Sequence, residues 1–382
     1  MARLGDVCNI LNGFAFKSEQ YVDEGIRIIR IANVQKGYIE DSTPVFYPID
    51  NKDAKKYSLE EGDMLMSLTG NVGRVAKLSK DFLPAALNQR VACLRIKDGV
   101  KLDKAFLFNL LNSDYFEQKC IAASKGVAQK NMSTEWLKEY EIPMFSIEQQ
   151  KSIAAVLDKV TELVALRKEQ LAKLDELVKA RFVELFGDPV LNTKGWIVDN
   201  AGKHIDLFSG YPFDSAGYVD TGINICGGLI IMPDRIVWDE CKHWNCANGY
   251  EDYLLAENDI VMALDRPWIS EGFKIAKVDA DHLPALLIQR TARIRSIDIH
   301  QSYLYHCFIN GGFDKHCNVT GSLVPHISAK DIRSFKIMLP PAELQNQFAA
   351  FVEQTNKSKL TIQASLDKLE VMKKALMQEY FG

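Results

Sequence analysis

Two stretches of the chain, each about 40 residues long, repeat apolar side chains at alternating steps of four and three residues. The first runs from Ile147 to Phe186 without a glycine or proline, and the second occupies residues 343–382. This 3.5-residue period is typical of a coiled-coil seam, so the pattern predicts two long helices, each a rod of roughly 60 Å. The seam positions are Leu157, Val164, Leu171 and Leu174 in the first helix and Ile362, Leu366 and Leu369 in the second.

The sequence ahead of the first long helix has a different pattern. Short runs rich in β-branched and other apolar residues lie at 26–31, 63–68 and 91–96, and turn residues such as Thr69-Gly70-Asn71 separate them. A helix is predicted over Lys104 to Gln118. We therefore expect a compact α+β globule before the long helix.

The second half of the chain repeats the first. The segment GFAFKS at 13–18 returns as GYPFDS at 210–215, an offset of 197 residues, and LNQR at 87–90 returns as LIQR at 287–290, an offset of 200. The dipeptide Phe-Gly that ends the first long stretch returns at the end of the second, at offset 195. Offsets that stay this constant predict two copies of one unit.

The duplication predicts a four-part chain. We expect one globule over 1–145, a spacer helix over 146–187, a second globule over 188–342 and a second spacer helix over 343–382. Because neither apolar stripe is stable in water alone, the helices are expected to pack against each other. A pseudo-two-fold relation between the copies would make the helices antiparallel, with one α/β-type globule at each end of a stiff spacer.

Charge and composition narrow the class of protein. Of the 382 residues, 47% are hydrophobic and 25% charged, which are globular values, and the net charge is −4. The first globule carries +1 and the second −5, so neither is a basic arm that would clamp phosphates by bulk charge. The eight cysteines are scattered and no apolar run could span a membrane, so we expect reduced thiols in a cytoplasmic protein.

The usual catalytic and metal-binding motifs are missing from the sequence. Neither a Walker A loop nor the Asn/Asp-Pro-Pro-aromatic tetrapeptide of amino-methyltransferases occurs, so no catalytic residue is predicted. Cys241, His243 and Cys246 resemble half of a zinc site, but no second pair with suitable spacing follows, so no metal is predicted. All seven histidines lie between His204 and His326, which argues against a catalytic role shared by both copies.

Polar and basic residues that recur in both copies are better candidates for a functional site. The first copy has a loop with two glycines at 69–74, and the corresponding loop of the second copy is 263–268. Gln-Arg dipeptides stand immediately before a strand in both copies. Arginine pairs bidentately with guanine and glutamine with adenine, so these residues fit a base-reading role, whereas capping a strand and pairing with a carboxylate is an equally good structural explanation. The candidates are Thr69, Asn71, Arg74, Gln89, Arg90, Arg266, Gln289 and Arg290.

In this order, and twice over, these features resemble the specificity subunit of type I restriction–modification systems. The resemblance rests on the order globule, helix, globule, helix, and on Gly13-x-x-Phe16, the Gly70-x-x-Gly73-Arg74 loop and Asn88-Gln89-Arg90. It also rests on the helix exit Leu185-Phe186-Gly187-Asp188-Pro189.

The resemblance implies a non-catalytic DNA reader in which each globule is a target-recognition domain for half of a split site. It implies double-stranded DNA and two methyltransferase subunits as partners, which a restriction/translocase subunit can join. No cofactor is expected on this chain, and S-adenosylmethionine, ATP and Mg²⁺ are expected on the partner subunits. Arg167 and Lys359 interrupt the helix seam, where they would face the methyltransferase, fix the helix register or simply be solvated.

Two other functions stay open at this stage. The globules of a non-enzymatic scaffold could bind peptides instead of DNA. A fused restriction–methylation polypeptide would need a methyl-donor motif, which the sequence lacks.

Overall fold

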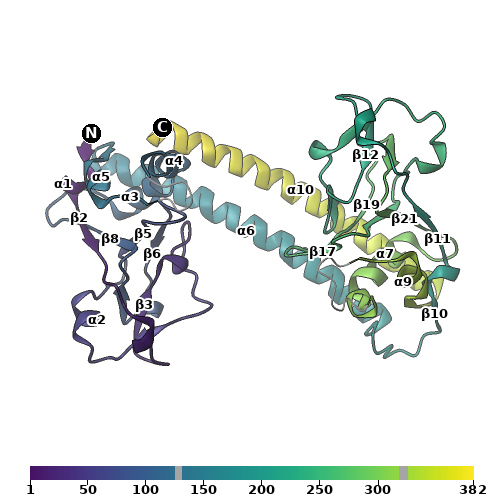
Figure 1. The fold of residues 1–382 in the computed structure, drawn as a ribbon, viewed down its shortest axis with the longest axis horizontal. Helices are drawn as coiled ribbons and strands as arrows, with labels where there is room; N and C mark the ends of the chain where they lie inside the picture. Colours follow the sequence, from purple (N-terminus) through teal and green to yellow (C-terminus); the bar gives the residue numbers. More distant parts are fainter. Residues whose placement is uncertain (125–130, 318–325) are drawn as a thin grey trace. The chain divides into compact units, whose positions relative to one another are not determined.

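In the computed structural model the chain divides into two compact units, described over residues 1–124, 131–317 and 326–382. Unit 1 comprises Met1–Glu169 with Gln363–Gly382, and unit 2 comprises Gln170–Ile362. Two helices of 40 residues, α6 (Ile147–Phe186) and α10 (Ala342–Phe381), belong to both units (Figure 1). The N-terminal part of α6 and the C-terminal part of α10 lie in unit 1, and their other parts lie in unit 2. Both predicted helices are confirmed. Apolar residues at this spacing form one continuous stripe only when the chain is helical, and no glycine or proline interrupts either run before its last residue.

The main sheets of unit 1 have four and three strands and match the predicted α+β class. The antiparallel sheet has four strands in the order β2-β8-β5-β6, and the mixed sheet has three in the order β4-β3-β7, with β3 and β7 parallel. The four-stranded sheet consists of β2 (Cys8–Asn12), β8 (Val91–Ile96), β5 (Met64–Ser67) and β6 (Val75–Lys77). The three-stranded sheet consists of β4 (Phe46–Tyr47), β3 (Ile26–Ile29) and β7 (Ala85–Leu87), and β1 (Ala2–Arg3) pairs with β9 (Glu141–Ile142).

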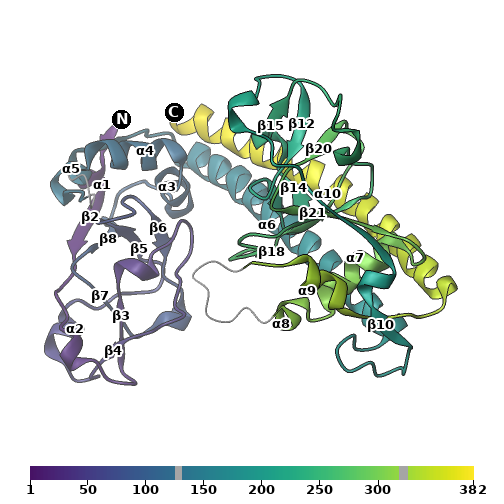
Figure 2. The ribbon, with the colours of Figure 1, turned by 45° about the vertical axis from the view of Figure 1, so that its right-hand side comes forward.

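Unit 2 repeats this topology, which confirms the duplication. Its sheets run β11-β21-β16-β19 and β15-β12-β20, and Figure 2 labels the three strands of the second sheet. Met64 pairs with Leu94 in unit 1, and Ile260 pairs with Ile294 at the equivalent place in unit 2. The strands are β11 (Ile205–Ser209), β21 (Thr291–Ser296), β16 (Ile260–Ala263), β19 (Ile275–Lys277), β15 (Lys242–Trp244), β12 (Ile223–Cys226) and β20 (Ala285–Leu287), and β10 (Val198–Asn200) pairs with β22 (Lys336–Met338). Unit 2 also has two hairpins, β13 (Ile231–Met232) with β14 (Arg235–Ile236) and β17 (Trp268–Ile269) with β18 (Gly272–Phe273).

The prediction of a single helix over 104–118 was wrong. The chain forms α3 (Lys104–Leu111) and then α4 (Asp114–Ala123), because the Ser113 hydroxyl accepts a hydrogen bond from the Phe116 amide at 3.2 Å and starts a new helix. Unit 2 breaks its helix at the same place, after α7 (Gln301–Asn310) and before α8 (Phe313–His316). The remaining short helices are α1 (Leu4–Val7), α2 (Lys52–Lys56), α5 (Thr134–Glu139) and α9 (Ala329–Ser334).

The long helices run antiparallel within each unit. In unit 1 Leu157 of α6 packs in one core with Phe381 of α10, whereas Lys168, further along α6, pairs with Glu370 at 2.8 Å. Unit 2 shows the same direction, because residues further along α6 contact residues earlier in α10. Asp175 pairs with Lys359, and Phe182 packs edge-on against Phe348. The side chains of the predicted helix seam are buried or half-buried. Leu157 and Leu366 are buried, and Val164, Leu171, Leu174, Ile362 and Leu369 are half-buried.

A buried glutamine fastens each long helix to the globule of its own copy. In unit 1 the Gln150 carbonyl oxygen accepts from the Asp103 amide at 2.8 Å, and its amide nitrogen donates to the Phe145 carbonyl at 2.9 Å. Gln345 does the same in unit 2, accepting from the His300 amide and donating to the Pro340 carbonyl, both at 2.8 Å. Asp103 and His300 cap α3 and α7, so the glutamine joins the starts of two helices and helps to place each globule on its helix.

Candidate nucleic-acid interface

In unit 1 the loop between β5 and β6 is a tight turn built around Ser67. The Ser67 hydroxyl donates to the Asn71 carbonyl at 2.5 Å and accepts from the Arg74 amide at 3.1 Å. Gly73 has a φ of +82°, and a Cβ there would lie 2.8 Å from the Cβ of Cys120 on α4, so only glycine fits. The turn therefore presents Asn71 and Arg74 in a fixed position.

The three candidate side chains of this loop have different environments. Thr69 is buried and its backbone bridges to Asn131, which makes it the weakest candidate for a base contact. Arg74 is half-buried and donates to the Gln35 side chain. With the Asn71 amide oriented to place its oxygen toward Arg74, that oxygen accepts from both terminal guanidinium nitrogens, at 3.3 and 3.2 Å. Asn71 and Arg74 thus form one pre-ordered polar group.

The Gln-Arg pair lies beside this loop. Gln89 and Arg90 are exposed immediately before β8, and the Leu68 amide donates to the Arg90 carbonyl at 3.0 Å. This bond brings Arg90 next to the start of the loop that carries Asn71. Unit 2 has the equivalent contact, from the Leu264 amide to the Arg290 carbonyl at 2.9 Å.

Arg290 combines the two interpretations that the sequence left open. Its guanidinium pairs with Asp265 at 2.7 Å, yet 74% of its side chain stays exposed. Burial raises the pKa of Asp265, but hydrogen bonds from His326 and Arg290 outweigh it and the pKa lies below its usual value. The carboxylate is therefore charged at neutral pH and orients Arg290 without covering it.

Comparing the sequences of the two copies did not identify Lys274 as the counterpart of Arg74. The Ala263 amide donates to the Lys274 carbonyl at 3.0 Å, as the Ser67 amide donates to the Arg74 carbonyl at 3.0 Å. The hairpin β17–β18 makes the loop of unit 2 longer than that of unit 1, so the segment taken as equivalent, 263–268, ended before Lys274. The offset of 200 that relates 287–290 to 87–90 also relates Lys274 to Arg74, and applying it to the loop would have found the pair.

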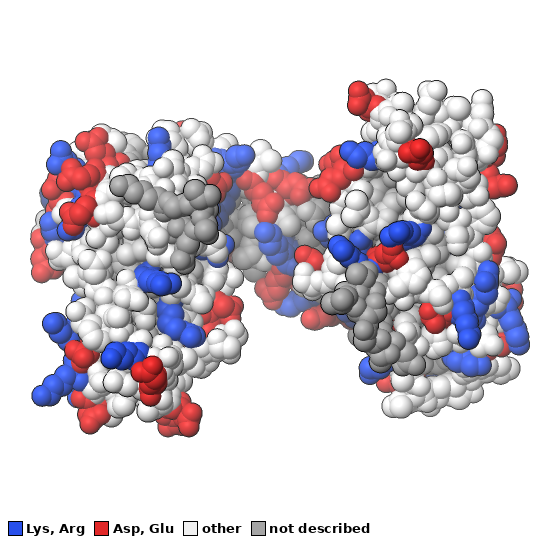
Figure 3. All heavy atoms as spheres, in the orientation of Figure 1, with Lys and Arg blue, Asp and Glu red and all other residues white. Residues whose placement is uncertain are grey.

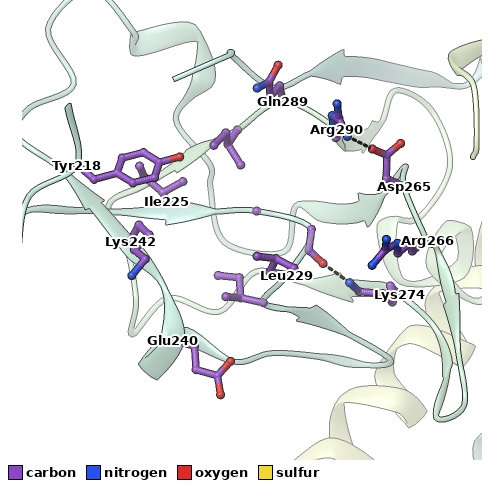
Figure 4. A pocket seen from close by; sticks show the side chains of 14 residues that line it. Tyr218, Ile225, Leu229, Glu240, Lys242, Asp265, Arg266, Lys274, Gln289 and Arg290 are labelled. Atoms are coloured by element: carbon purple, nitrogen blue, oxygen red, sulfur yellow. Dashed lines mark hydrogen bonds and ion pairs between the residues drawn. The ribbon is translucent and has the colours of Figure 1, made fainter. Parts of the chain in front are cut away.

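Lys274 is directed inward, unlike Arg74. Its side chain is buried and its ammonium group donates to the Gly228 carbonyl, while burial lowers its pKa. It borders a cavity of about 650 Å³ that is also lined by three predicted DNA-contact residues, Arg266, Gln289 and Arg290 (Figure 4). Unit 2 thus gathers its candidates around a hollow. The rest of the lining is Tyr218, Ile225, Gly227, Gly228, Leu229, Ile230, Glu240, Lys242, Asp265 and Ile288.

Lys359, which interrupts the helix seam, joins four elements of unit 2. Its ammonium group pairs with Asp175 of α6 at 2.7 Å and with Asp234, between β13 and β14, at 3.1 Å. The buried Tyr305 hydroxyl of α7 donates to the other Asp234 oxygen at 2.9 Å. Of the roles considered for Lys359, this geometry favours fixing the helix register.

Replacing Lys359 by methionine is expected to lower the free energy of unfolding of unit 2 by about 1–2 kcal/mol, because two carboxylates lose their shared cation. Burial lowers the pKa of Lys359, but Asp234 and Asp175 outweigh it and hold the pKa above its ordinary 10.5. The stabilisation is therefore complete below pH 10.5 and disappears as pH rises through the raised pKa. Thermal melts of wild type and variant should differ at pH 7 and converge in strong alkali.

Lys357→Met is the matched control for Lys359. Lys357 pairs with Glu353 one turn away on the same helix, and its side chain is 73% exposed, so its removal should change the melting temperature little. Equal effects of the two variants would contradict the register role.

Charged side chains of both signs are present on the face of the molecule that Figure 3 shows. On that face, basic and acidic side chains are interspersed over both units and most of the surface is uncharged.

Within the described ranges, no helix has the length and apolar character needed to cross a lipid bilayer. His, Cys, Asp and Glu side chains of those same ranges form no cluster of three that could bind a metal.

Comparison with known proteins identifies the class. The family described as the type I restriction modification DNA specificity domain matches residues 1–176 and 245–371. The chain therefore belongs to this family. It is a DNA sequence-recognition subunit of the type I restriction–modification class and not a catalytic subunit.

Individual relatives span very different shares of the chain. The MjaVIII specificity subunit of Methanocaldococcus jannaschii is 23% identical over 99% of this chain and 90% of its own length. The EcoAI specificity subunit of Escherichia coli is 28% identical over 53% of this chain, but the match covers only 36% of that subunit. The solved S subunit from M. genitalium has the same fold, with a TM-score of 0.61 and 16% identity over 100% of this chain and 95% of that one.

Proposed function

We propose that each globule reads one half of a split site in double-stranded DNA, the first over residues 1–145 and the second over 188–342. The observation that carries the proposal is the exposed Gln-Arg pair, held beside the same loop by the same backbone hydrogen bond in both units. Arginine and glutamine are the side chains that pair bidentately with guanine and adenine. The neighbouring residues differ between the units, as two unlike half-sites require.

We assign the candidate contacts unit by unit. Unit 1 offers Asn71, Arg74, Gln89 and Arg90, with Thr69 as a backbone support. Unit 2 offers Arg266, Gln289 and Arg290, and Asp265 orients the last of these. The chain carries no net positive charge, so most phosphate contacts are assigned to partner subunits.

We assign the outer faces of the helices, residues 146–187 and 343–382, to the docking of two methyltransferase subunits. Leu360 and Val371 on α10 are each 71% exposed, so neither is used in packing the two helices together. The seam residues, by contrast, serve the packing of the helices themselves. The complex is placed in the cytoplasm, a restriction/translocase subunit can join it, and S-adenosylmethionine, ATP and Mg²⁺ belong to the partners. A peptide-binding scaffold is not favoured, because the family is one of DNA readers.

The test is selection of duplexes from a random pool by this chain co-expressed with its methyltransferase. The expected result is a split sequence whose two halves change independently when unit 1 or unit 2 residues are altered. Binding of that duplex should weaken steeply with salt and exceed random-sequence binding by at least about 1,000-fold.

Two results would oppose the proposal. Recovery of no common sequence, with the complex shown to be intact, would overturn the DNA-reading role. Recovery of one uninterrupted sequence that responds to changes in only one unit would overturn the assignment of a half-site to each globule.

A further inference from the structure

The cavity of unit 2 has the lining of a site for a flat ring. Ile225 and Ile230 are buried, Ile288 is half-buried, and the Tyr218 ring faces the hollow (Figure 4). At about 650 Å³ the cavity falls within the size range of sites for small molecules, which are mostly apolar with a few polar groups that fix orientation. The exposed Gln289 amide at its rim is such a group.

Leu229 stands at the edge of this cavity with 87% of its surface exposed. The turn that carries it is held firmly, because the Ile230 amide donates to the Gly227 carbonyl at 3.1 Å and Lys274 donates to the Gly228 carbonyl. Cys226 and Ile230, on either side of the turn, are buried. A leucine projected into water from a fixed turn is suited to insertion between stacked bases.

The charge of the lining fits an anionic partner. Four cations, Lys242, Arg266, Lys274 and Arg290, line the cavity with two carboxylates, Glu240 and Asp265. This excess of positive charge stands out in a globule whose own net charge is −5. Phosphates beside a bound base would find Arg266 and Lys242 exposed at the rim.

We propose that unit 2 turns one nucleobase of its half-site out of the stack and holds it in this cavity, while Leu229 fills the vacated space. Gln289 reads the edge of the base, and Tyr218 contacts its face. Unstacking a base costs free energy, which burial of the base and the cations of the rim offset. This inference rests on the proposed DNA-reading function.

The test uses the complex with its methyltransferase and the selected duplex. 2-Aminopurine is placed at each purine position of the second half-site in turn, and permanganate probes the thymines. One position should brighten or react several-fold more strongly on binding. Leu229→Ala and Ile288→Trp, which fills the cavity, should remove most of that signal. Leu191→Ala, at another leucine of unit 2 that is 75% exposed and does not line the cavity, should leave it intact.

The outcomes separate this inference from the function on which it rests. Specific binding without any position that brightens or reacts overturns the base-holding role alone. A signal that survives in both Leu229→Ala and Ile288→Trp, with binding retained, assigns the unstacking to the methyltransferase and also overturns it. Failure to select any sequence overturns the DNA-reading function and this inference together.

Discussion

Replacing Arg74 by alanine is expected to weaken binding of the selected duplex by about 10- to 100-fold and to relax the sequence preference in the half-site read by unit 1 only. The guanidinium is half-buried between Gln35 and Asn71, so its orientation is fixed before DNA arrives. Lysine cannot reproduce a planar bidentate donor, so Arg74→Lys should lose nearly as much specificity. Competition binding against duplexes with single base changes measures both effects.

Lys77→Ala provides the comparison for Arg74. Lys77 is an exposed cation on β6, close in sequence to Arg74. Its loss should weaken binding to all duplexes alike, through phosphate contacts, and reduce the salt dependence. The thermal melt of Arg74→Lys should match that of wild type. A uniform loss of affinity in Arg74→Lys, with the base preference unchanged, would show that Arg74 contacts only the backbone.

Replacing Asp259 by alanine is expected to lower the free energy of unfolding of unit 2 by about 2–4 kcal/mol. The carboxylate is 3% exposed, and its oxygens accept from Arg295 at 2.5 and 2.7 Å. The same oxygen that accepts the longer of these bonds also accepts from the Ala256 amide at 2.7 Å. Three donors would lose their partner, and the melting temperature of unit 2 should fall by roughly 5–12 °C in calorimetry.

Glu257→Ala, in the same turn, is the control for Asp259. Glu257 is exposed, and its replacement should move the melting temperature by less than about 2 °C. An equally small shift for Asp259→Ala would mean that water replaces the ion pair. Asp63 in unit 1 pairs with Arg95 through two bonds of 2.7 Å and accepts from the Glu60 amide at 2.8 Å, so Asp63→Ala should repeat the effect there.

Local pattern was a good guide wherever a segment's structure depends on its own residues. The helix predicted from Ile147 to Phe186 has those bounds, and β8 occupies the predicted 91–96. The helix over 104–118 failed because Ser113 satisfies a backbone donor better as a cap than inside a helix. Its hydroxyl was readable in the sequence, but its choice between the two roles depends on how α3 and α4 pack.

The candidate site was only partly predictable for the same reason. The Gln-Arg pairs were found because both copies keep them in the same local setting. Lys274 was missed as the counterpart of Arg74, although the offset of 200 residues relates the two positions. No local pattern indicated that Thr69 is buried or that Leu229 and Gln289 line the same cavity. Each of these depends on contacts between segments far apart in the chain, such as the bond from Lys274 to Gly228.

The sequence alone determined the duplication, the α+β class, the two long helices and the family, because these depend on periodicity and on the order of motifs. Only the tertiary structure decided which side chains share a surface. Asp175, Asp234 and Lys359 come from three separate elements, and no local rule joins them. The physical reason is that an apolar period specifies which face a helix buries, whereas the neighbours of a polar group depend on the packing of the whole unit.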